Sequence, residues 1–406
     1  MRTGIVGSGT MGTGIAVAFA NAGGHVRVVD ANAEALGRAG ATIEQMYRRA
    51  VERGSLSAAA AAERLRCISL GTELAALADS ELLVEAVFEN LAVKADIFAE
   101  VGRIIGSEAI LATNTSTLDV DAIVAAAPFP ERSLGMHFFS PAHLMKLVEV
   151  VRATRTSSGT IGRVVAIAKS IGKIPIVVGN GDGFVGNRML LRYRREAELL
   201  LEAGATPQQV DHALREFGFA LGPFAVSDLA GLDIAYSAKQ ERMRRGGLPF
   251  RQSRVPDLLV EAGRLGQKSG AGYYRYERGS RTPIVDPAVG EIVAAERERL
   301  AIVPRTVDDG EIVGRTTLAL FNEGARILRD GVAASSADID AIWVNGYGFP
   351  AARGGPMAYA ASLGADAVMA TIARFAQDDP AFWASDVAEA VLHRRTTLPP
   401  PRRRTS

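Results

Sequence analysis

The sequence predicts an α/β Rossmann-type N-terminal domain followed by an all-α C-terminal region made of two similar helical domains. Three observations lead to this expectation. The chain opens with a short apolar strand, a glycine-rich turn and a helix. Short apolar runs then alternate with helical patterns to about residue 180, as in a parallel sheet with crossover helices. Beyond that point the pattern is helical, and a late stretch is similar to an earlier one.

The composition narrows the class of protein. The chain has 406 residues, 48% of them apolar, which is enough for two or three domains. The formal net charge is +1, so the chain as a whole is not electrostatically attracted to nucleic acid, and we expect no nucleic-acid partner. Cys67 is the one cysteine, so we expect a reducing compartment, no disulfide and no metal site. The sequence has no unbroken apolar run of membrane-spanning length and no signal-peptide pattern, so it predicts a cytoplasmic protein without a span.

The opening turn has the spacing of a dinucleotide-binding motif. Gly7, Gly9 and Gly12 form G-x-G-x-x-G between the strand Thr3–Val6 and the helix that follows. Such a turn presents free N–H groups and the positive end of a helix dipole to a pyrophosphate. A second strand ends in Asp30, where an acid accepts from ribose hydroxyls and repels a 2′-phosphate, which favours NAD over NADP. The alternative is an ordinary strand–turn–helix unit with an unrelated acid.

Several later strands end in polar residues. A long helical stretch first runs from Asp30 to about Arg64, and its arginines serve either solubility or the phosphates of a substrate. The strand Glu81–Val87 is then followed by Glu89 and Asn90, and the strand Ala109–Thr113 by the run Asn114–Thr117. Open α/β sheets bind ligands at the carboxyl ends of their strands, so we expect these groups to lie at a site.

The helical C-terminal half contains an internal repeat. The run from Glu323 resembles the run from Glu196, and each is followed by a glycine, a capped helix and a Gly-Pro pair. Two copies would pack as pseudo-dimer halves, so we expect an internally paired monomer or a homodimer. The predicted parts are a nucleotide-binding domain with a helical insertion, a first helical domain, a connector, a second helical domain and a disordered tail, at residues 1–180, 181–277, 278–311, 312–395 and 396–406.

One of the five histidines stands out as a proton acceptor. His137 lies where an apolar run leaves the sheet, and Glu149 lies in the next strand. This spacing lets the chain turn back so that the carboxylate meets the imidazole. A buried carboxylate would hold one tautomer and stabilise the charged ring. A core histidine with satisfied hydrogen bonds is the alternative.

Four segments resemble one enzyme family. GMHFFSPAHLMKLVEVV at residues 135–151 is similar to the catalytic signature of the L-3-hydroxyacyl-CoA dehydrogenases. EAVFENLAVK, ATNTST and GDGFVGNRM, which begin at residues 85, 112 and 181, resemble the same family. The second helical copy, with YGFPAARGGPMAYA at residues 347–360, resembles the last domain of the multifunctional fatty-acid oxidation enzymes. Because this chain starts at the nucleotide turn, the resemblance implies no hydratase activity.

The resemblance implies roles for particular residues. His137 would be the general base, Glu149 would orient it, and Ser116 and Asn187 would hydrogen-bond the substrate oxygen. Otherwise Ser116 and Asn187 would be a helix cap and a turn residue, and Glu89 and Lys94 a solvated pair. Arg53 would contact coenzyme A, although Met46 stands at the position of a family hydroxyl. The NAD contacts implied are Gly7, Gly9, Thr10, Met11, Gly12, Asp30, Ala86, Glu89, Lys94 and Asn114.

Together these features predict an NAD-dependent dehydrogenase that interconverts L-3-hydroxyacyl-CoA and 3-oxoacyl-CoA in fatty-acid β-oxidation. One alternative keeps the fold and replaces the thioester with a free hydroxy acid. Another is a non-catalytic NAD-binding protein. The set formed by His137, Glu149, Ser116 and Asn187 argues against the last, because a protein without turnover has no need of it.

Overall fold

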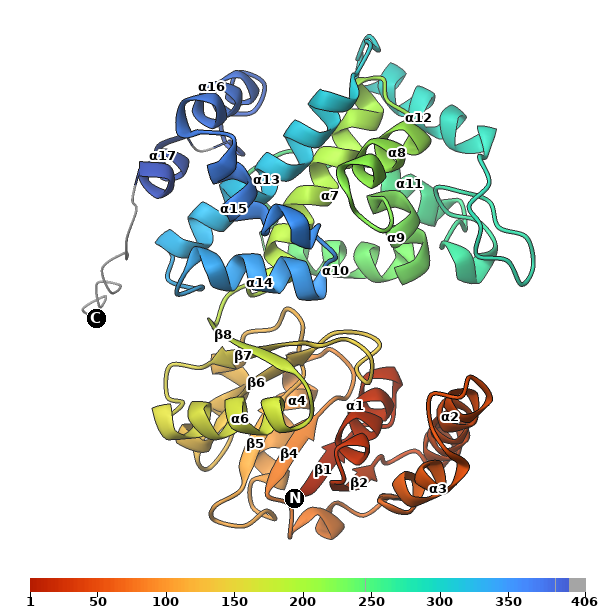
Figure 1. The fold of residues 1–406 in the computed structure, drawn as a ribbon, viewed down its shortest axis with the longest axis vertical. Helices are drawn as coiled ribbons and strands as arrows, with labels where there is room; N and C mark the ends of the chain where they lie inside the picture. Colours follow the sequence, from red (N-terminus) through yellow and green to blue (C-terminus); the bar gives the residue numbers. More distant parts are fainter. Residues whose placement is uncertain (245, 384, 394–406) are drawn as a thin grey trace. The chain divides into compact units, whose positions relative to one another are not determined.

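The computed structural model describes residues 1–244, 246–383 and 385–393, which form two compact units (Figure 1). Unit 1 comprises Met1–Asn187 together with Asp330–Tyr347. Unit 2 comprises Arg188–Arg329 and the described residues from Gly348 onward. These limits differ from the domain boundaries expected from the sequence, which stay predictions. The expected tail at 396–406 lies outside the described residues.

Unit 1 is built on an eight-stranded sheet with the order β3-β2-β1-β4-β5-β6-β7-β8. β1 to β6 are parallel, β7 is antiparallel to β6, and β8 is parallel to β7. The order of the first six strands is that of a dinucleotide-binding sheet, which confirms the predicted Rossmann-type fold. The strands are β1 (Arg2–Val6), β2 (His25–Val29), β3 (Ile68–Gly71), β4 (Leu82–Glu85), β5 (Ile110–Thr113), β6 (Ser133–Phe138), β7 (Leu147–Arg152) and β8 (Ile174–Gly179).

The predicted helical excursion after Asp30 is a pair of helices. Asn32 caps the first and Ser57 caps the second, and the chain turns between them at Gly54, where φ is +69°. The first buries a stripe of apolar residues three or four positions apart, which packs it against the N-terminal helix. The helices of unit 1 are α1 (Thr10–Asn21), α2 (Ala33–Glu52), α3 (Ala58–Arg66), α4 (Leu91–Val101), α5 (Val120–Val124), α6 (Ser158–Ser170) and α14 (Ser336–Gly346).

Unit 2 is helical, and the predicted all-α C-terminal region is confirmed. Its helices are α7 (Gly186–Ala203, whose first two residues belong to unit 1), α8 (Pro207–Phe217), α9 (Pro223–Ala230), α10 (Leu232–Arg244), α11 (Val255–Glu261), α12 (Pro287–Arg299), α13 (Asp309–Arg329), α15 (Pro356–Ser362), α16 (Ala365–Ala376) and α17 (Ser385–His393). Across the described residues, no helix is both long enough and apolar enough to cross a bilayer.

The two helical copies follow the same succession of elements. α7, α8 and α9 correspond to α13, α14 and α15, and hydroxyl side chains at Thr206 and Ser335 cap the middle helix of each copy. α14 nevertheless belongs to unit 1, where it packs on β7 and β8. The second copy is therefore divided between the units, because sequence similarity records a shared pattern and compactness depends on where each apolar face packs.

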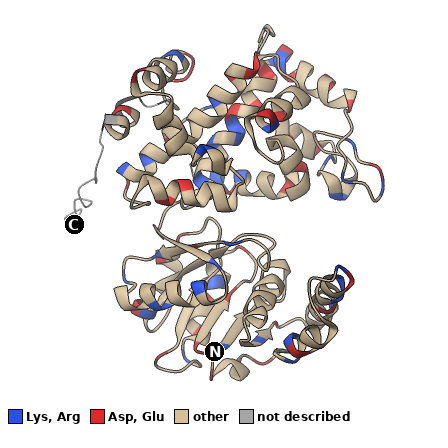
Figure 2. Ribbon diagram, viewed as in Figure 1, with Lys and Arg blue, Asp and Glu red and all other residues tan. Residues whose placement is uncertain are grey.

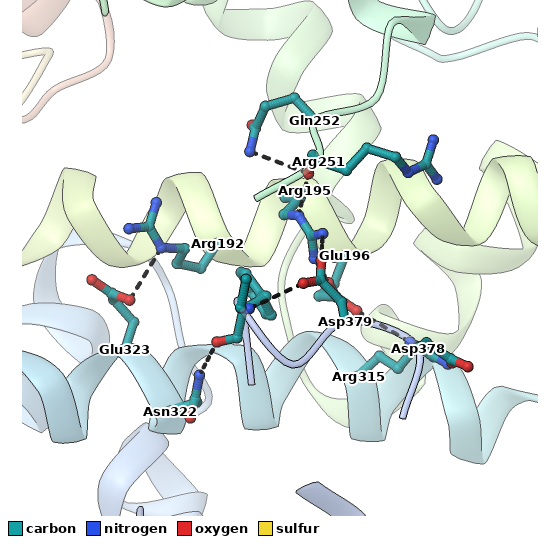
Figure 3. Close-up of polar contacts among 12 residues, drawn as sticks. Arg192, Arg195, Glu196, Arg251, Gln252, Arg315, Asn322, Glu323, Asp378 and Asp379 are labelled. Carbon is teal, nitrogen blue, oxygen red and sulfur yellow. Dashed lines mark hydrogen bonds and ion pairs between the residues drawn. The ribbon is translucent and has the colours of Figure 1, made fainter. Parts of the chain in front are cut away.

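Buried ion pairs join α7 to α13 within unit 2, where acidic and basic residues are interspersed along the helices (Figures 2 and 3). Glu323 Oε1 lies 2.5 Å from Arg188 Nε, and Oε2 lies 3.1 Å from Arg192 Nε. Glu196 Oε2 lies 3.5 Å from Arg315 Nη1. The repeat aligns Glu196 with Glu323 and Arg188 with Arg315. Each acid thus faces the arginine of the other copy, which is the reciprocal pattern of a two-fold interface.

We predict that Glu323→Gln lowers the free energy of unfolding by about 3 kcal/mol at pH 7, because the guanidinium groups of Arg188, Arg192 and Arg326 lose their buried counter-charge. Burial raises the pKa of Glu323, but Arg192 and Arg188 outweigh it and hold this pKa below its usual value. The stabilisation is therefore complete above the ordinary glutamate pKa and is lost as the pH falls through the lowered one. The difference from the unaltered protein should be smaller at pH 4 than at pH 7.

Urea unfolding followed by Trp383 fluorescence measures this effect. A Trp343→Phe background isolates the signal, because Trp343 lies in unit 1 and Trp383 in unit 2. The matched control is Glu241→Gln, whose partner Arg244 has a side chain 73% exposed, so the change should stay within about 0.5 kcal/mol. Equal effects of the two variants would contradict the prediction.

Candidate active site

The glycine-rich turn between β1 and α1 leaves room for a ligand. Gly7 has φ of +104°, and a Cβ on Gly12 would lie 1.9 Å from the carbonyl oxygen of Gly7, so the turn needs both glycines. A Cβ on Gly9 would meet no atom within 4 Å. Gly9 is also the N-cap of α1, and no side chain caps that helix. Free N–H groups therefore face open space at the positive end of α1, which suits a phosphate.

A cavity of about 850 Å³ begins at this turn. Five of the expected cofactor contacts line it: Gly7, Gly9, Thr10, Asp30 and Ala86. The other expected contacts support the site in different ways, since Met11 packs against the core and Asn114 accepts a hydrogen bond from Phe138 N at 2.9 Å. The size of this cavity, its uncapped helix and its acid fit a dinucleotide.

Asp30 at the end of β2 is held by three hydrogen bonds. Its Oδ2 accepts from Ser8 N at 2.8 Å and Ser8 Oγ at 2.7 Å, and its Oδ1 accepts from Asn32 N at 2.9 Å. Burial raises the pKa of Asp30, but these bonds outweigh it and hold the pKa below its usual value. Asp30 is thus a fixed carboxylate at neutral pH, as ribose hydroxyls require.

A buried lysine organises the polar groups at the ends of β4 and β5. Lys94 is 1% exposed, and its Nζ lies 2.7 Å from Glu85 Oε1 and 3.4 Å from Glu89 Oε2. Lys94 is therefore not solvated, whereas the Glu89 side chain stays 35% exposed. Glu89 Oε1 accepts from Thr115 Oγ1 at 2.7 Å, from Ser116 N at 2.8 Å and from Ser116 Oγ at 3.1 Å. Burial raises the pKa of Glu89, but Lys94 and these donors hold it below its usual value.

His137 and Glu149 are direct partners across the antiparallel strands β6 and β7. His137 Nδ1 lies 2.7 Å from Glu149 Oε2, and the carboxylate is fully buried. The rings of Phe139 and Phe184 flank the imidazole at centroid distances of 4.5 and 5.8 Å. A neutral imidazole that donates its Nδ1–H to this carboxylate keeps Nε2 as an acceptor.

The same carboxylate fixes the start of α7. Glu149 Oε1 accepts from Val185 N at 3.2 Å and from Gly186 N at 3.0 Å. Asn187 follows in the first turn of the helix, and its Nδ2 donates to the carbonyl oxygen of Ser116 at 3.2 Å. Unit 1 therefore links His137, Glu149, Ser116 and Asn187 through hydrogen bonds to one another or to adjacent backbone.

Three residues in this region had no assigned role in the sequence. Ser8 lies within the glycine motif, and nothing in that motif signals its bonds to Asp30. Glu85 falls inside the expected strand Glu81–Val87, where the sequence indicates no partner for it. Tyr347 opens the YGFP motif of the second copy, and its hydroxyl donates to Asn187 Oδ1 at 2.8 Å. The only indication of this role in the sequence is that Tyr347 belongs to the motif YGFPAARGGPMAYA, which resembles the multifunctional enzymes.

The expected coenzyme A contacts are less closely tied to this region. Arg53 is the exposed C-cap residue of α2. Burial lowers the pKa of His143, and the positive charges of Lys173 and Arg53 lower it further. Met46 lines the dinucleotide cavity, together with Thr42 one turn earlier on the same helix. Among the described residues, no cluster of three or more histidines, cysteines or acids is suited to hold a metal ion.

The sheet order, the glycine turn and the acid after β2 define the chain as a protein of the Rossmann-type, NAD-binding dehydrogenase class. The family model for the 3-hydroxyacyl-CoA dehydrogenase NAD binding domain matches residues 2–181. The model for the C-terminal domain of the same enzymes matches residues 183–276. The chain therefore belongs to the 3-hydroxyacyl-CoA dehydrogenase family, and the predicted family and its cofactor NAD are confirmed.

Individual relatives agree with this assignment. The peroxisomal bifunctional enzyme of Danio rerio is 42% identical over 90% of this chain and 52% of its own length, so the chain spans about half of the curated relatives it matches. The structure of 3-hydroxybutyryl-CoA dehydrogenase from Escherichia coli is 28% identical with a TM-score of 0.84, over 97% of this chain and 98% of that one. The (S)-3-hydroxybutyryl-CoA dehydrogenase from Ralstonia eutropha is 35% identical with a TM-score of 0.64, over 68% and 99%.

We predict that Gly9→Ala weakens NADH binding at least tenfold without lowering the melting temperature, because the added Cβ meets no protein atom and enters the space in front of α1. NADH fluorescence titration and thermal melting measure the two effects. Gly37→Ala in α2 is the control, since its Cβ also meets nothing within 4 Å. Unchanged NADH affinity in Gly9→Ala would show that the turn does not hold the cofactor.

Asp30→Ala should lower the ratio of NADH affinity to NADPH affinity by about tenfold or more, because a charge-assisted acceptor is lost and a 2′-phosphate is no longer repelled. Paired titrations with the two cofactors give this ratio. Glu34→Ala removes another acid at the start of α2 and should leave the ratio unchanged. A preference for NADPH in the unaltered protein would contradict the role of Asp30.

Proposed function

We propose that this protein catalyses the NAD-dependent, reversible oxidation of L-3-hydroxyacyl-CoA to 3-oxoacyl-CoA. The observation that supports this most directly is the buried contact between His137 Nδ1 and Glu149 Oε2, with Ser116 and Asn187 joined beside it. Hydride transfer from an alcohol releases a proton, and an imidazole held by a carboxylate is suited to accept it.

His137 is the general base in this proposal. Its Nδ1–H donates to Glu149, so Nε2 takes the proton of the substrate 3-hydroxyl as the C–O bond becomes a carbonyl. The imidazole gains a positive charge, and the buried Glu149 carboxylate stabilises it. In the reverse direction, Nε2 returns the same proton to the forming hydroxyl.

Ser116 and Asn187 stabilise the substrate oxygen. The Nδ2 amino group of Asn187 has two N–H donors, and one of them binds the carbonyl oxygen of Ser116. The other serves the oxygen at C3, where negative charge develops. The Ser116 hydroxyl donates to Glu89, so it turns from that carboxylate to the substrate when the site fills.

The bound nicotinamide supplies the hydride acceptor. The residues of this chain that hold the cofactor are those of the glycine turn together with Asp30. A thioester substrate is supported by the names of the relatives, two of which are 3-hydroxybutyryl-CoA dehydrogenases. The β-oxidation pathway is supported by the relative from Arabidopsis thaliana, which is named a peroxisomal fatty acid beta-oxidation multifunctional protein.

The cytoplasmic location and the oligomeric state remain predictions. The Danio rerio relative is named as peroxisomal, whereas the Psychrobacter arcticus relative is named as a subunit of a fatty acid oxidation complex. The reciprocal pairing of α7 with α13 supports an internally paired chain.

NADH oxidation with acetoacetyl-CoA, a longer 3-oxoacyl-CoA and free acetoacetate tests the reaction. We expect turnover of the thioesters alone. Turnover of the free acid would favour a hydroxy-acid dehydrogenase instead. If none of the three compounds is turned over and NADH still binds, a non-catalytic NAD-binding protein becomes the better explanation.

His137→Ala should lower kcat by about 10²- to 10⁴-fold while NADH still binds, because the general base is lost and the nucleotide site is untouched. Glu149→Gln should lower kcat as well, since an amide cannot balance the charged imidazole. Stopped-flow and steady-state rates with acetoacetyl-CoA measure both. His212→Ala, on α8 in unit 2, is the control and should retain normal rates. Near-normal turnover in His137→Ala would overturn the base assignment.

A further inference from the structure

We infer that Tyr347, from the second helical copy, is a positioning residue that orients the amide of Asn187 for the reaction. This inference rests on the proposed function, in which Asn187 donates to the substrate oxygen. Tyr347 follows α14 and lies 160 positions after Asn187 in the chain, and both belong to unit 1. Its hydroxyl donates to Asn187 Oδ1 at 2.8 Å.

The two hydrogen bonds of Asn187 leave one orientation for its amide. The carbonyl oxygen of Ser116 is an acceptor only, so the amide must turn its Nδ2 toward it. Oδ1 then faces Tyr347, whose hydroxyl is able to donate. With both ends held, the second N–H of Nδ2 points in a fixed direction. Without the phenol, Oδ1 has no donor at this point, and rotation about the side-chain bonds is less restricted.

The tyrosine ring is held in place by contacts that fit it closely. It stacks on Trp343 at a centroid distance of 4.8 Å and meets Phe139 edge-on at 5.4 Å. A Cβ on Gly186 would lie 2.4 Å from the Tyr347 hydroxyl oxygen, so the residue before Asn187 must be glycine for the ring to lie there. Phe139 also packs against the His137 ring. Phe139 therefore packs against both the imidazole of His137 and the ring of Tyr347, whose hydroxyl binds the Asn187 amide.

The segment that brings Tyr347 here is anchored on the sheet. α14 packs on β7 and β8, and Gly179 N donates to Val332 O at 2.7 Å just before that helix. A Cβ on Gly346 would lie 2.5 Å from a methyl group of Leu147 on β7, so the chain approaches the sheet closely next to Tyr347. The second copy thus supplies a group to the site as well as a surface to the fold.

Tyr347→Phe tests the inference, because it removes the hydroxyl and keeps the ring. We expect kcat with acetoacetyl-CoA to fall about five- to tenfold, the loss of one neutral hydrogen bond, with KM within about twofold. The effect should vanish in an Asn187→Ala background if the hydroxyl acts through that amide. Tyr359→Phe on α15 removes a hydroxyl in unit 2 and should leave both constants unchanged. An unchanged kcat, or an equal loss in the Asn187→Ala background, would overturn the inference.

A second measurement does not depend on turnover. In protein labelled with ¹⁵N at asparagine side chains, the Asn187 signal is identified by its disappearance in Asn187→Ala. Tyr347→Phe should shift that signal and speed its hydrogen exchange, and Tyr359→Phe should not. An unmoved signal would overturn the inference. If the unaltered protein turns over no thioester, the proposed function fails, and this signal alone decides whether Tyr347 orients Asn187.

Discussion

The buried carboxylate of Glu149 is the constraint on which the candidate site depends. One oxygen faces the His137 imidazole, and the other accepts from two backbone amides at the start of α7. A buried charge needs several partners, and here those partners come from the sheet and from a helix N-terminus, whose dipole favours an anion. Because the same group binds both elements, it fixes the distance between the base and the helix turn that presents Asn187.

Buried ion pairs also hold α7 of the first helical copy against α13 of the second. Glu323 and Glu196 occupy equivalent positions, and each faces the arginine that the repeat places on the opposite helix. Desolvating a charge is unfavourable, so such pairs stabilise an arrangement mainly by destabilising every alternative that separates them. The reciprocal pattern therefore specifies which faces of α7 and α13 meet. This pairing also accounts for the presence of the same charged residues at equivalent positions of the two copies, whose sequences otherwise differ at most positions.

The sequence was sufficient for the nucleotide-binding fold and for the pairing of His137 with Glu149 because these signals are local. The glycine turn allows few backbone geometries, and alternating strands and helices with right-handed crossovers indicate a parallel sheet. The antiparallel turn after His137 brings Glu149 opposite it within twelve residues. Long-range packing gives no such signal. The burial of Lys94 between Glu85 and Glu89, and the placement of α14 on the sheet, depend on side chains that meet across the fold.

The repeat shows why similarity between copies does not determine how they are used. α8 and α14 have the same type of cap and the same place in the succession, yet α8 belongs to unit 2 and α14 packs on the sheet of unit 1. Two equal copies in a closed pair have equivalent surroundings only if everything around them is also doubled. Here there is one nucleotide-binding sheet for two helical copies. α14 packs on this sheet, and Tyr347 directly after it hydrogen-bonds Asn187. α8, the corresponding helix of the first copy, belongs to unit 2 and has different neighbours. The two copies therefore place different side chains at this point.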